Sequence, residues 1–323
     1  MPFICDANRH WIGNAWVSPY PRRSLSSVFL FLAGGNILSI CRTNYRLAAA
    51  QIQCSLADVA HNIETHRRVI EEARQREIDV LVFPELSLTG YDLGNRVPEV
   101  AMHRDDPRLV QLAESVGNML TVVGFVERCG RGEYANSMAC LCSGQVVAVH
   151  RKVNLCTYGG HEEGKHFSKG QSLTVADADG LACGVMICAD LWNPGLAHAA
   201  MMERPDVMLA PVNAATGMVD GDFDDEGNWL ICLKFYAMMY ATPMVMAHRY
   251  GAEGDAWFWG GSCIVDVDGK VLVRAEDGET LVSADIDTDA IDAARFAMPT
   301  HRDADTPLVA SLMAQRLERE RHG

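Results

Sequence analysis

The sequence predicts an α/β fold, built on one mixed sheet or on two sheets packed face to face with helices outside. In the first half of the chain, apolar runs of strand length alternate with segments of helical periodicity. In the second half, strand-like runs follow one another closely and are joined by turn signals such as the Asp-Gly of "DVDGK". Alternation followed by hairpins is typical of this class.

The regular pattern begins at Tyr45. The run "YRLAAAQIQC" predicts a strand, and the next segment has apolar residues at helical spacing from Val59 to Ala73, with Ser55 and Asp58 as candidate caps. Further strands are expected at residues 78–83, 120–127, 145–152, 182–188, 206–212, 243–249, 262–269 and 271–276. Further helices are expected at residues 107–117, 194–203 and 228–241.

These elements form one predicted domain over residues 45–295. Residues 1–44 differ, because a basic pair and an apolar patch precede "LSIC", which ends in Cys41 and is similar to a lipoprotein export site. Ile40 is bulky where such a site needs a small residue, and glycines interrupt the apolar run. We therefore expect an extension outside the core and a cytoplasmic protein, with an exported lipoprotein as the alternative. Residues 296–323 are expected to form a polar tail that frays or wraps a partner.

Composition excludes several function classes. The 323 residues carry a formal net charge of -14, which repels nucleic acid, so no such partner is expected. The apolar patch near the N-terminus is too short to span a bilayer, and no membrane association is expected. The 11 cysteines are odd in number, lack framework spacing and often lie in apolar runs, which favours a reducing compartment.

Metal and cofactor motifs are weak. Cys156, His161 and His166 lie near one another, but no second cluster has the spacing of a zinc site. No glycine-rich phosphate loop with a Lys-Ser/Thr ending is present. We therefore expect neither a metal nor a cofactor.

Three reactive side chains stand where apolar runs end. Glu85 follows "VLVFP", Lys152 follows "VVAVHR" and Cys188 follows "GVMI". Taken singly, each fits an ordinary role in a loop, at a strand end or in the core. Together they form a set for acyl transfer, because strand ends deliver side chains to a shared crevice. A carboxylate can take the thiol proton, and an ammonium can stabilise the oxyanion, with the backbone N–H of Ala189 as a second donor.

The neighbourhoods of these residues resemble a known family. The segments "FPELSLTGY" (83–91), "HRKVNL" (150–155) and "GVMICADLWNP" (184–194) are similar, in this order, to the three catalytic boxes of the nitrilase superfamily of carbon–nitrogen hydrolases. "EEGKHFSKG" (162–170) resembles the segment with a second glutamate, here Glu163, and "WGGSCIVDVDGKVL" (259–272) resembles the late strand and hairpin. The resemblance covers about residues 46–290. It implies a four-layer αββα sandwich of two mixed sheets with outer helices, which assembles as a homodimer or higher homo-oligomer.

The resemblance also implies a role for each matching residue. Glu85 corresponds to the general base and acid, Lys152 to the cation that stabilises the oxyanion, and Cys188 to the nucleophile. Glu163 corresponds to an auxiliary carboxylate that orients the lysine or the substrate. The implied activity is hydrolysis of a carbon–nitrogen bond other than a peptide bond, through a thioester, giving an acid and ammonia or an amine.

The residues after Cys188 bear on the substrate. Members that hydrolyse nitriles tend to have tryptophan directly after the nucleophile, whereas this chain has Ala189. A small amide or carbamoyl amide is therefore expected, with Tyr91 and Trp192 as candidate pocket residues. The chain departs from the family at Met239, where a glutamate is usual, and this leaves the subfamily open. A nitrilase, an amide acyltransferase and a catalytically silent binding protein with the nitrilase fold remain alternatives.

Overall fold

The computed structural model describes residues 32–33, 36–37, 42–157, 162–217, 219 and 223–322. The chain divides into two compact units, Met1–Cys41 and Arg42–Gly323. In the first unit, the described residues form two short antiparallel strands, β1 (Leu32–Ala33) and β2 (Asn36–Ile37). The lipoprotein-like "LSIC" and the basic pair before it lie outside the described residues.

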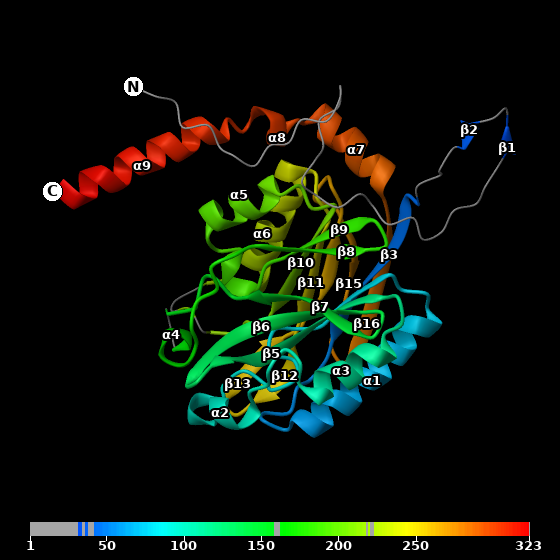
Figure 1. The fold of residues 1–323 in the computed structure, drawn as a ribbon, viewed down its shortest axis with the longest axis vertical. Helices are drawn as coiled ribbons and strands as arrows, with labels where there is room; N and C mark the ends of the chain where they lie inside the picture. Colours follow the sequence, from blue (N-terminus) through cyan, green and yellow to red (C-terminus); the bar gives the residue numbers. More distant parts are fainter. Residues whose placement is uncertain are drawn as a thin grey trace. The chain divides into compact units, whose positions relative to one another are not determined.

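The second unit contains two six-stranded mixed sheets (Figure 1). The first sheet has, in spatial order, β16 (Thr280–Asp287), β3 (Asn44–Gln51), β4 (Val80–Val82), β5 (Leu120–Gly130), β6 (Glu133–Cys142) and β7 (Gln145–Arg151). The second has β15 (Val271–Arg274), β14 (Cys263–Val265), β11 (Met244–His248), β10 (Val207–Val212), β9 (Leu181–Val185) and β8 (Thr174–Ala178). In each sheet three central strands run parallel and the outer strands join them antiparallel.

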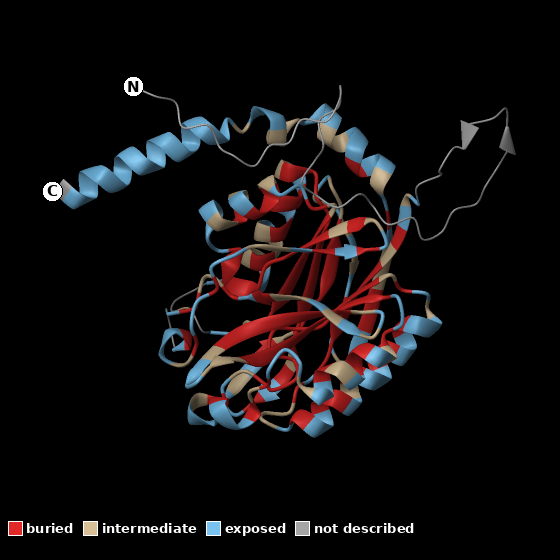
Figure 2. Cartoon of the chain, viewed as in Figure 1, coloured by how far each residue is buried: buried red, intermediate tan, exposed pale blue. Residues whose placement is uncertain are grey.

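Helices cover the outer face of each sheet (Figure 1). The helices α1 (Val59–Gln75) and α3 (Pro107–Ser115) pack on the first sheet, and α5 (Pro194–Met202) and α6 (Asp225–Tyr240) on the second. Alternation along β3 explains the layers: Leu47 and Ala49 face the other sheet, whereas Ala48 and Ala50 face the helices. Figure 2 shows the central strands of both sheets buried, whereas edge strands such as β7 and β15 are partly exposed. The αββα architecture expected from the resemblance is therefore confirmed.

Smaller elements complete the unit. They are the hairpin β12 (Tyr250–Glu253) and β13 (Ala256–Trp259), the helices α2 (Val97–Val100), α4 (Glu163–His166), α7 (Thr288–Ala297), α8 (Thr300–Asp303) and α9 (Thr306–His322), and two 3₁₀ turns at Gly94–Arg96 and Cys188–Asp190. The C-terminal segment, expected to fray or to wrap a partner, is mostly helical, with the described side chains of α9 exposed. Of the helices described, none is long and apolar enough to cross a membrane.

Most predicted elements occur within a few residues of their expected bounds. Asp58 caps α1 as expected, accepting a hydrogen bond from the backbone N–H of His61. The strand expected at residues 182–188 ends at Val185, so Cys188 lies beyond the sheet in a 3₁₀ turn.

The outer face of α6 exposes Ile231, Phe235 and Met238. The homo-oligomer stays a prediction.

Candidate active site

Glu85 lies in the loop that follows β4 and is completely buried. Its Oε1 accepts hydrogen bonds from Asn136 Nδ2 on β6 at 2.6 Å and from Lys152 Nζ at 2.7 Å. Its Oε2 is buried and has no hydrogen-bond partner among the described residues. The carboxylate is thus held firmly by one oxygen while the other can act on a further proton donor.

Lys152 follows the last residue of β7 and is also fully buried. Its Nζ donates to Glu85 Oε1 and to Glu163 Oε1, both at 2.7 Å. Burial opposes the charge of the ammonium, but Glu163 and Glu85 outweigh it and raise the pKa of Lys152 well above its usual value. Lys152 is therefore a permanent cation between two carboxylates.

The same environment makes Glu85 a weaker acid. Burial raises the pKa of Glu85 to about 7, with Lys152 opposing the rise and Glu163 adding to it. A carboxylate with a pKa near neutrality can both accept and return a proton under ordinary conditions.

Cys188 opens the 3₁₀ turn after β9 with a positive φ of 46°. Residues other than glycine rarely adopt this conformation, and where it occurs it is concentrated at functional sites. Ala189 follows in the same turn and is buried. The turn directs the chain away from the sheet, so that Cys188 lines a cavity.

Asp190 fastens this turn to the segment after Lys152. Its Oδ1 accepts hydrogen bonds from the backbone N–H groups of Val153 at 3.0 Å and Asn154 at 2.7 Å. Its Oδ2 accepts from the N–H of Ile187 at 2.9 Å and lies 3.3 Å from His150 Nε2. One buried carboxylate therefore fixes the positions of the thiol and of the lysine relative to each other.

The cavity that Cys188 lines has a volume of about 380 Å³ and mostly apolar walls. Trp192 forms part of the wall, with its ring centroid 5.3 Å from that of Trp229 and 6.1 Å from that of Phe223. Among the described residues that line the cavity, Asp225 is the only charged one. The cavity thus suits a small ligand with an apolar arm.

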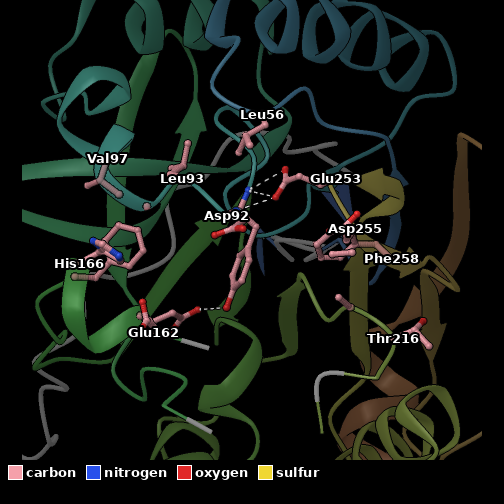
Figure 3. A pocket seen from close by; sticks show the side chains of 17 residues that line it. Leu56, Asp92, Leu93, Val97, Glu162, His166, Thr216, Glu253, Asp255 and Phe258 are labelled. Carbon is pink, nitrogen blue, oxygen red and sulfur yellow. Dashed lines mark hydrogen bonds between the residues drawn. The ribbon is translucent and has the colours of Figure 1, made fainter. Parts of the chain in front are cut away.

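Glu163 and Tyr91 line a second cavity, of about 610 Å³. Figure 3 shows this cavity from close by. Tyr91 lines this cavity, and its hydroxyl donates to Glu163 Oε1 at 2.7 Å. The loop that carries Tyr91 is held by Glu253, whose Oε1 accepts from the backbone N–H of Asp92 at 2.8 Å. Glu253 is itself paired with the buried Arg249.

The structure thus links Glu85, Lys152 and Glu163 directly, while Cys188 and Trp192 line one cavity. Tyr91, expected beside the substrate together with Trp192, lines the other cavity and donates to Glu163, which in turn accepts from Lys152.

Sequence reasoning assigned no site role to four residues that the structure puts here: Asn136, Cys156, Asp190 and Asn213. The polar position two residues after Cys188 was a visible signal for Asp190. Asn213 follows β10, and its Nδ2 donates to the backbone carbonyl oxygen of Glu85 at 3.1 Å. This hydrogen bond joins segments from the two sheets that are distant in sequence, so no local sequence pattern predicts it.

Candidate metal ligands are not clustered. Within the described ranges, no group of three or more histidine, cysteine, aspartate or glutamate side chains is arranged to hold a metal ion. His161, one of the residues considered from the sequence, lies outside those ranges.

The chain matches a family model and is similar to several known proteins. The model of the carbon–nitrogen hydrolase family matches residues 46–296. The glutamine-dependent NAD(+) synthetase of Thermotoga maritima is 27% identical over 254 residues, which cover 76% of this chain and 42% of that protein. The N-carbamoylputrescine amidase of Solanum lycopersicum is 27% identical over 276 residues, covering 80% of this chain and 91% of that protein. The chain thus spans less than half the length of the synthetase.

Among solved structures, an amidase of the nitrilase superfamily from Nesterenkonia matches with a TM-score of 0.67 at 22% identity. The match covers 81% of this chain and 97% of the amidase. At this identity the likeness concerns the fold.

Proposed function

Because the chain belongs to the carbon–nitrogen hydrolase family, whose members act on carbon–nitrogen bonds other than peptide bonds, we propose that it hydrolyses a small amide or carbamoyl amide through a thioester on Cys188. The products are an acid and ammonia or an amine. The observation that carries this proposal is the buried Glu85, with one oxygen anchored to Lys152 and Asn136 and the other without a partner among the described residues.

In the first half of the reaction, Glu85 accepts the proton of Cys188, and the thiolate attacks the carbonyl carbon of the amide. A proton acceptor is needed, because the hydrogen bond with Cys156, burial and Glu85 raise the pKa of the Cys188 thiol well above its usual value. The negative oxygen that forms is stabilised by the Lys152 ammonium and by the backbone N–H of Ala189.

Glu85 then donates its proton to the leaving nitrogen, and the carbon–nitrogen bond breaks to leave the thioester. In the second half, Glu85 activates a water molecule that hydrolyses the thioester and frees Cys188. Glu163 holds the other side of Lys152, so that the ammonium keeps its position throughout. The positions of these groups support a reaction in two similar halves.

The cavity beside Cys188 favours an amide with an uncharged or cationic arm. Trp192, Phe223 and Trp229 offer aromatic faces, and Asp225 contributes the only charge among the described lining residues. The α-carboxylate of glutamine would meet no cation on that lining. A carbamoyl amine, the kind of compound named for the tomato relative, suits these walls better than glutamine does.

The Cys188→Ala variant tests the proposal. We expect the wild-type protein to release ammonia from aliphatic amides or carbamoyl amines in preference to nitriles and glutamine. The variant should lose on the order of 10⁴-fold or more in kcat/KM, as enzymes do when they lose a covalent nucleophile. Cys142→Ala, a substitution at the far end of β6, serves as the control and should keep wild-type rates. Full hydrolytic activity in Cys188→Ala would refute the scheme.

The pH dependence gives a second test. Glu85 must be ionised to accept a proton, so kcat/KM should rise with pH and level off above about 7, the pKa to which burial raises this carboxyl. Glu163 contributes to that rise, so Glu163→Gln should move the midpoint to lower pH by roughly one unit. Glu162→Gln, a change at an exposed neighbour, should leave the midpoint in place. A midpoint that moves to higher pH in Glu163→Gln would contradict the role of Glu85.

A further inference from the structure

Cys156 is a second thiol beside the proposed nucleophile. It lies four residues after Lys152, is almost completely buried, and lines the same cavity as Cys188. The side chains of the two cysteines are hydrogen-bonded to each other, and Lys152 Nζ lies 3.8 Å from Cys156 Sγ. Of the nine cysteines in the described part of the chain, only these two line this cavity. No step of the proposed hydrolysis uses Cys156.

The surroundings of the pair favour one thiolate beside one thiol. The hydrogen bond with Cys188 lowers the pKa of Cys156, burial opposes this, and the Lys152 ammonium lowers the pKa further. The same hydrogen bond and burial raise the pKa of Cys188. When one sulfur has lost its proton, the other keeps its own and donates to it. A thiolate with a neighbouring thiol is the arrangement in which oxidation ends in a disulfide and does not proceed to higher acids.

We propose that hydroperoxides convert Cys156 and Cys188 into a disulfide that reversibly blocks the active site. The inference rests on the proposed function for its effect on activity, but the formation of the bond does not depend on it. Two sulfurs already in hydrogen-bond contact have only to close to a bond length of about 2 Å.

The chemistry balances with hydrogen peroxide as the only other reactant. Its terminal oxygen is transferred to the thiolate of the pair, giving a sulfenic acid and hydroxide. The second sulfur attacks the sulfenic sulfur, so that the S–S bond forms as the S–O bond breaks. The proton of the second thiol leaves with that oxygen in water. The two thiols lose two electrons, which reduce the O–O bond of the peroxide, and a dithiol reductant reverses the change.

The three cysteines of the core between and behind the sheets are less suited to this reaction. Cys140, Cys183 and Cys263 are buried in the core, and burial raises the pKa of each thiol. Such thiols remain protonated and react slowly. The cavity at Cys156 and Cys188 instead gives a small oxidant the path that the substrate itself would use.

The test combines peptide mapping with activity. The full chain is treated with a small excess of hydrogen peroxide, alkylated, digested without reduction and analysed by mass spectrometry. We expect a linked pair of peptides containing residues 156 and 188, two hydrogens lighter than their sum. Hydrolysis should fall at least about tenfold and recover on treatment with dithiothreitol. Cys142→Ala should behave like the wild-type chain.

The Cys156→Ala variant removes the partner sulfur. In this variant no linked peptide can form, and any Cys188 that is oxidised should go on to the sulfinic acid, from which dithiothreitol does not restore activity. A wild-type map with sulfinic acid at Cys188 and no linked peptide would overturn the inference and leave the proposed function intact. Conversely, a linked peptide in a protein whose Cys188→Ala variant still hydrolyses amides would refute the proposed function alone. If Cys156→Ala does not fold, the wild-type map decides by itself.

Discussion

Replacing Lys152 with methionine should give an inactive protein that is also markedly less stable. Among the described residues, the ammonium is the only cation that contacts both buried carboxylates, Glu85 and Glu163, at 2.7 Å each. Breaking a buried ion pair by removing one partner typically costs about 3–5 kcal/mol. Loss of a group that stabilises the oxyanion lowers kcat by roughly 10² to 10³-fold or more. Urea unfolding and ammonia release measure the two effects.

The loss of stability should depend on pH. Lys152 opposes the rise in the pKa of Glu85, so without the cation that pKa moves further above its value in the unfolded chain, and the folded state keeps the proton to higher pH. Raising the pH then favours unfolding, so the deficit of Lys152→Met should be larger at pH 8 than at pH 5.5. Lys165→Met, which breaks an exposed pair with Glu162, is the control and should unfold like the wild-type chain. Equal deficits at the two pH values would mean that Lys152 does not lower the pKa of Glu85.

The second large loss of activity and stability is expected when Gly124 on β5 is replaced by alanine. A Cβ at this position would overlap the backbone N of Leu86 and lie 2.6 Å from the carbonyl oxygen of Pro84. The loop that carries Glu85 therefore packs directly against the backbone of Gly124. The backbone N–H of Leu88 also donates a hydrogen bond to the carbonyl oxygen of Gly124 at 2.8 Å. The atoms involved are backbone, so the loop itself has to move when a methyl group is added.

Gly124→Ala should therefore displace Glu85, lower kcat by on the order of 10²-fold and cost about 1–3 kcal/mol of stability. The matched substitution is Gly195→Ala in α5, where a Cβ would meet only Asn193 Oδ1 at 3.6 Å. Steady-state kinetics and thermal unfolding of the two variants compare them directly. Wild-type kcat in Gly124→Ala would show that the position of the loop does not limit the reaction.

The proposed catalytic residues can be predicted from the sequence more easily than the residues that hold them in place. Glu85, Lys152 and Cys188 stand at the ends of apolar runs, and their neighbourhoods resemble the nitrilase superfamily, a membership that the match over residues 46–296 confirms. Each signal is local, because a strand and the residue that ends it are adjacent in the chain.

The elements and contacts that support the proposed catalytic residues could not be predicted from the sequence, for physical reasons. The strand β6 was not predicted because Asn136 and Ser137 place polar groups in the middle of its run, and both are buried to bind Glu85 and Glu127. The contact of Cys156 with Cys188 joins residues that are distant in sequence, so periodicity does not reveal it. The α9 helix was missed because its described side chains are exposed and supply no burial pattern.

The division of the candidate site between the two sheets has a consequence for how function can be lost. The acid and the amine belong to one half of the sandwich, whereas the thiol and Asn213 belong to the other. Neither sheet carries all the proposed catalytic groups. A small shift of one sheet relative to the other would therefore separate Cys188 from Glu85 and Lys152 without breaking any strand. The catalytic rate should therefore respond to a change in the packing of the two sheets that a spectroscopic measurement of strand or helix content would not detect.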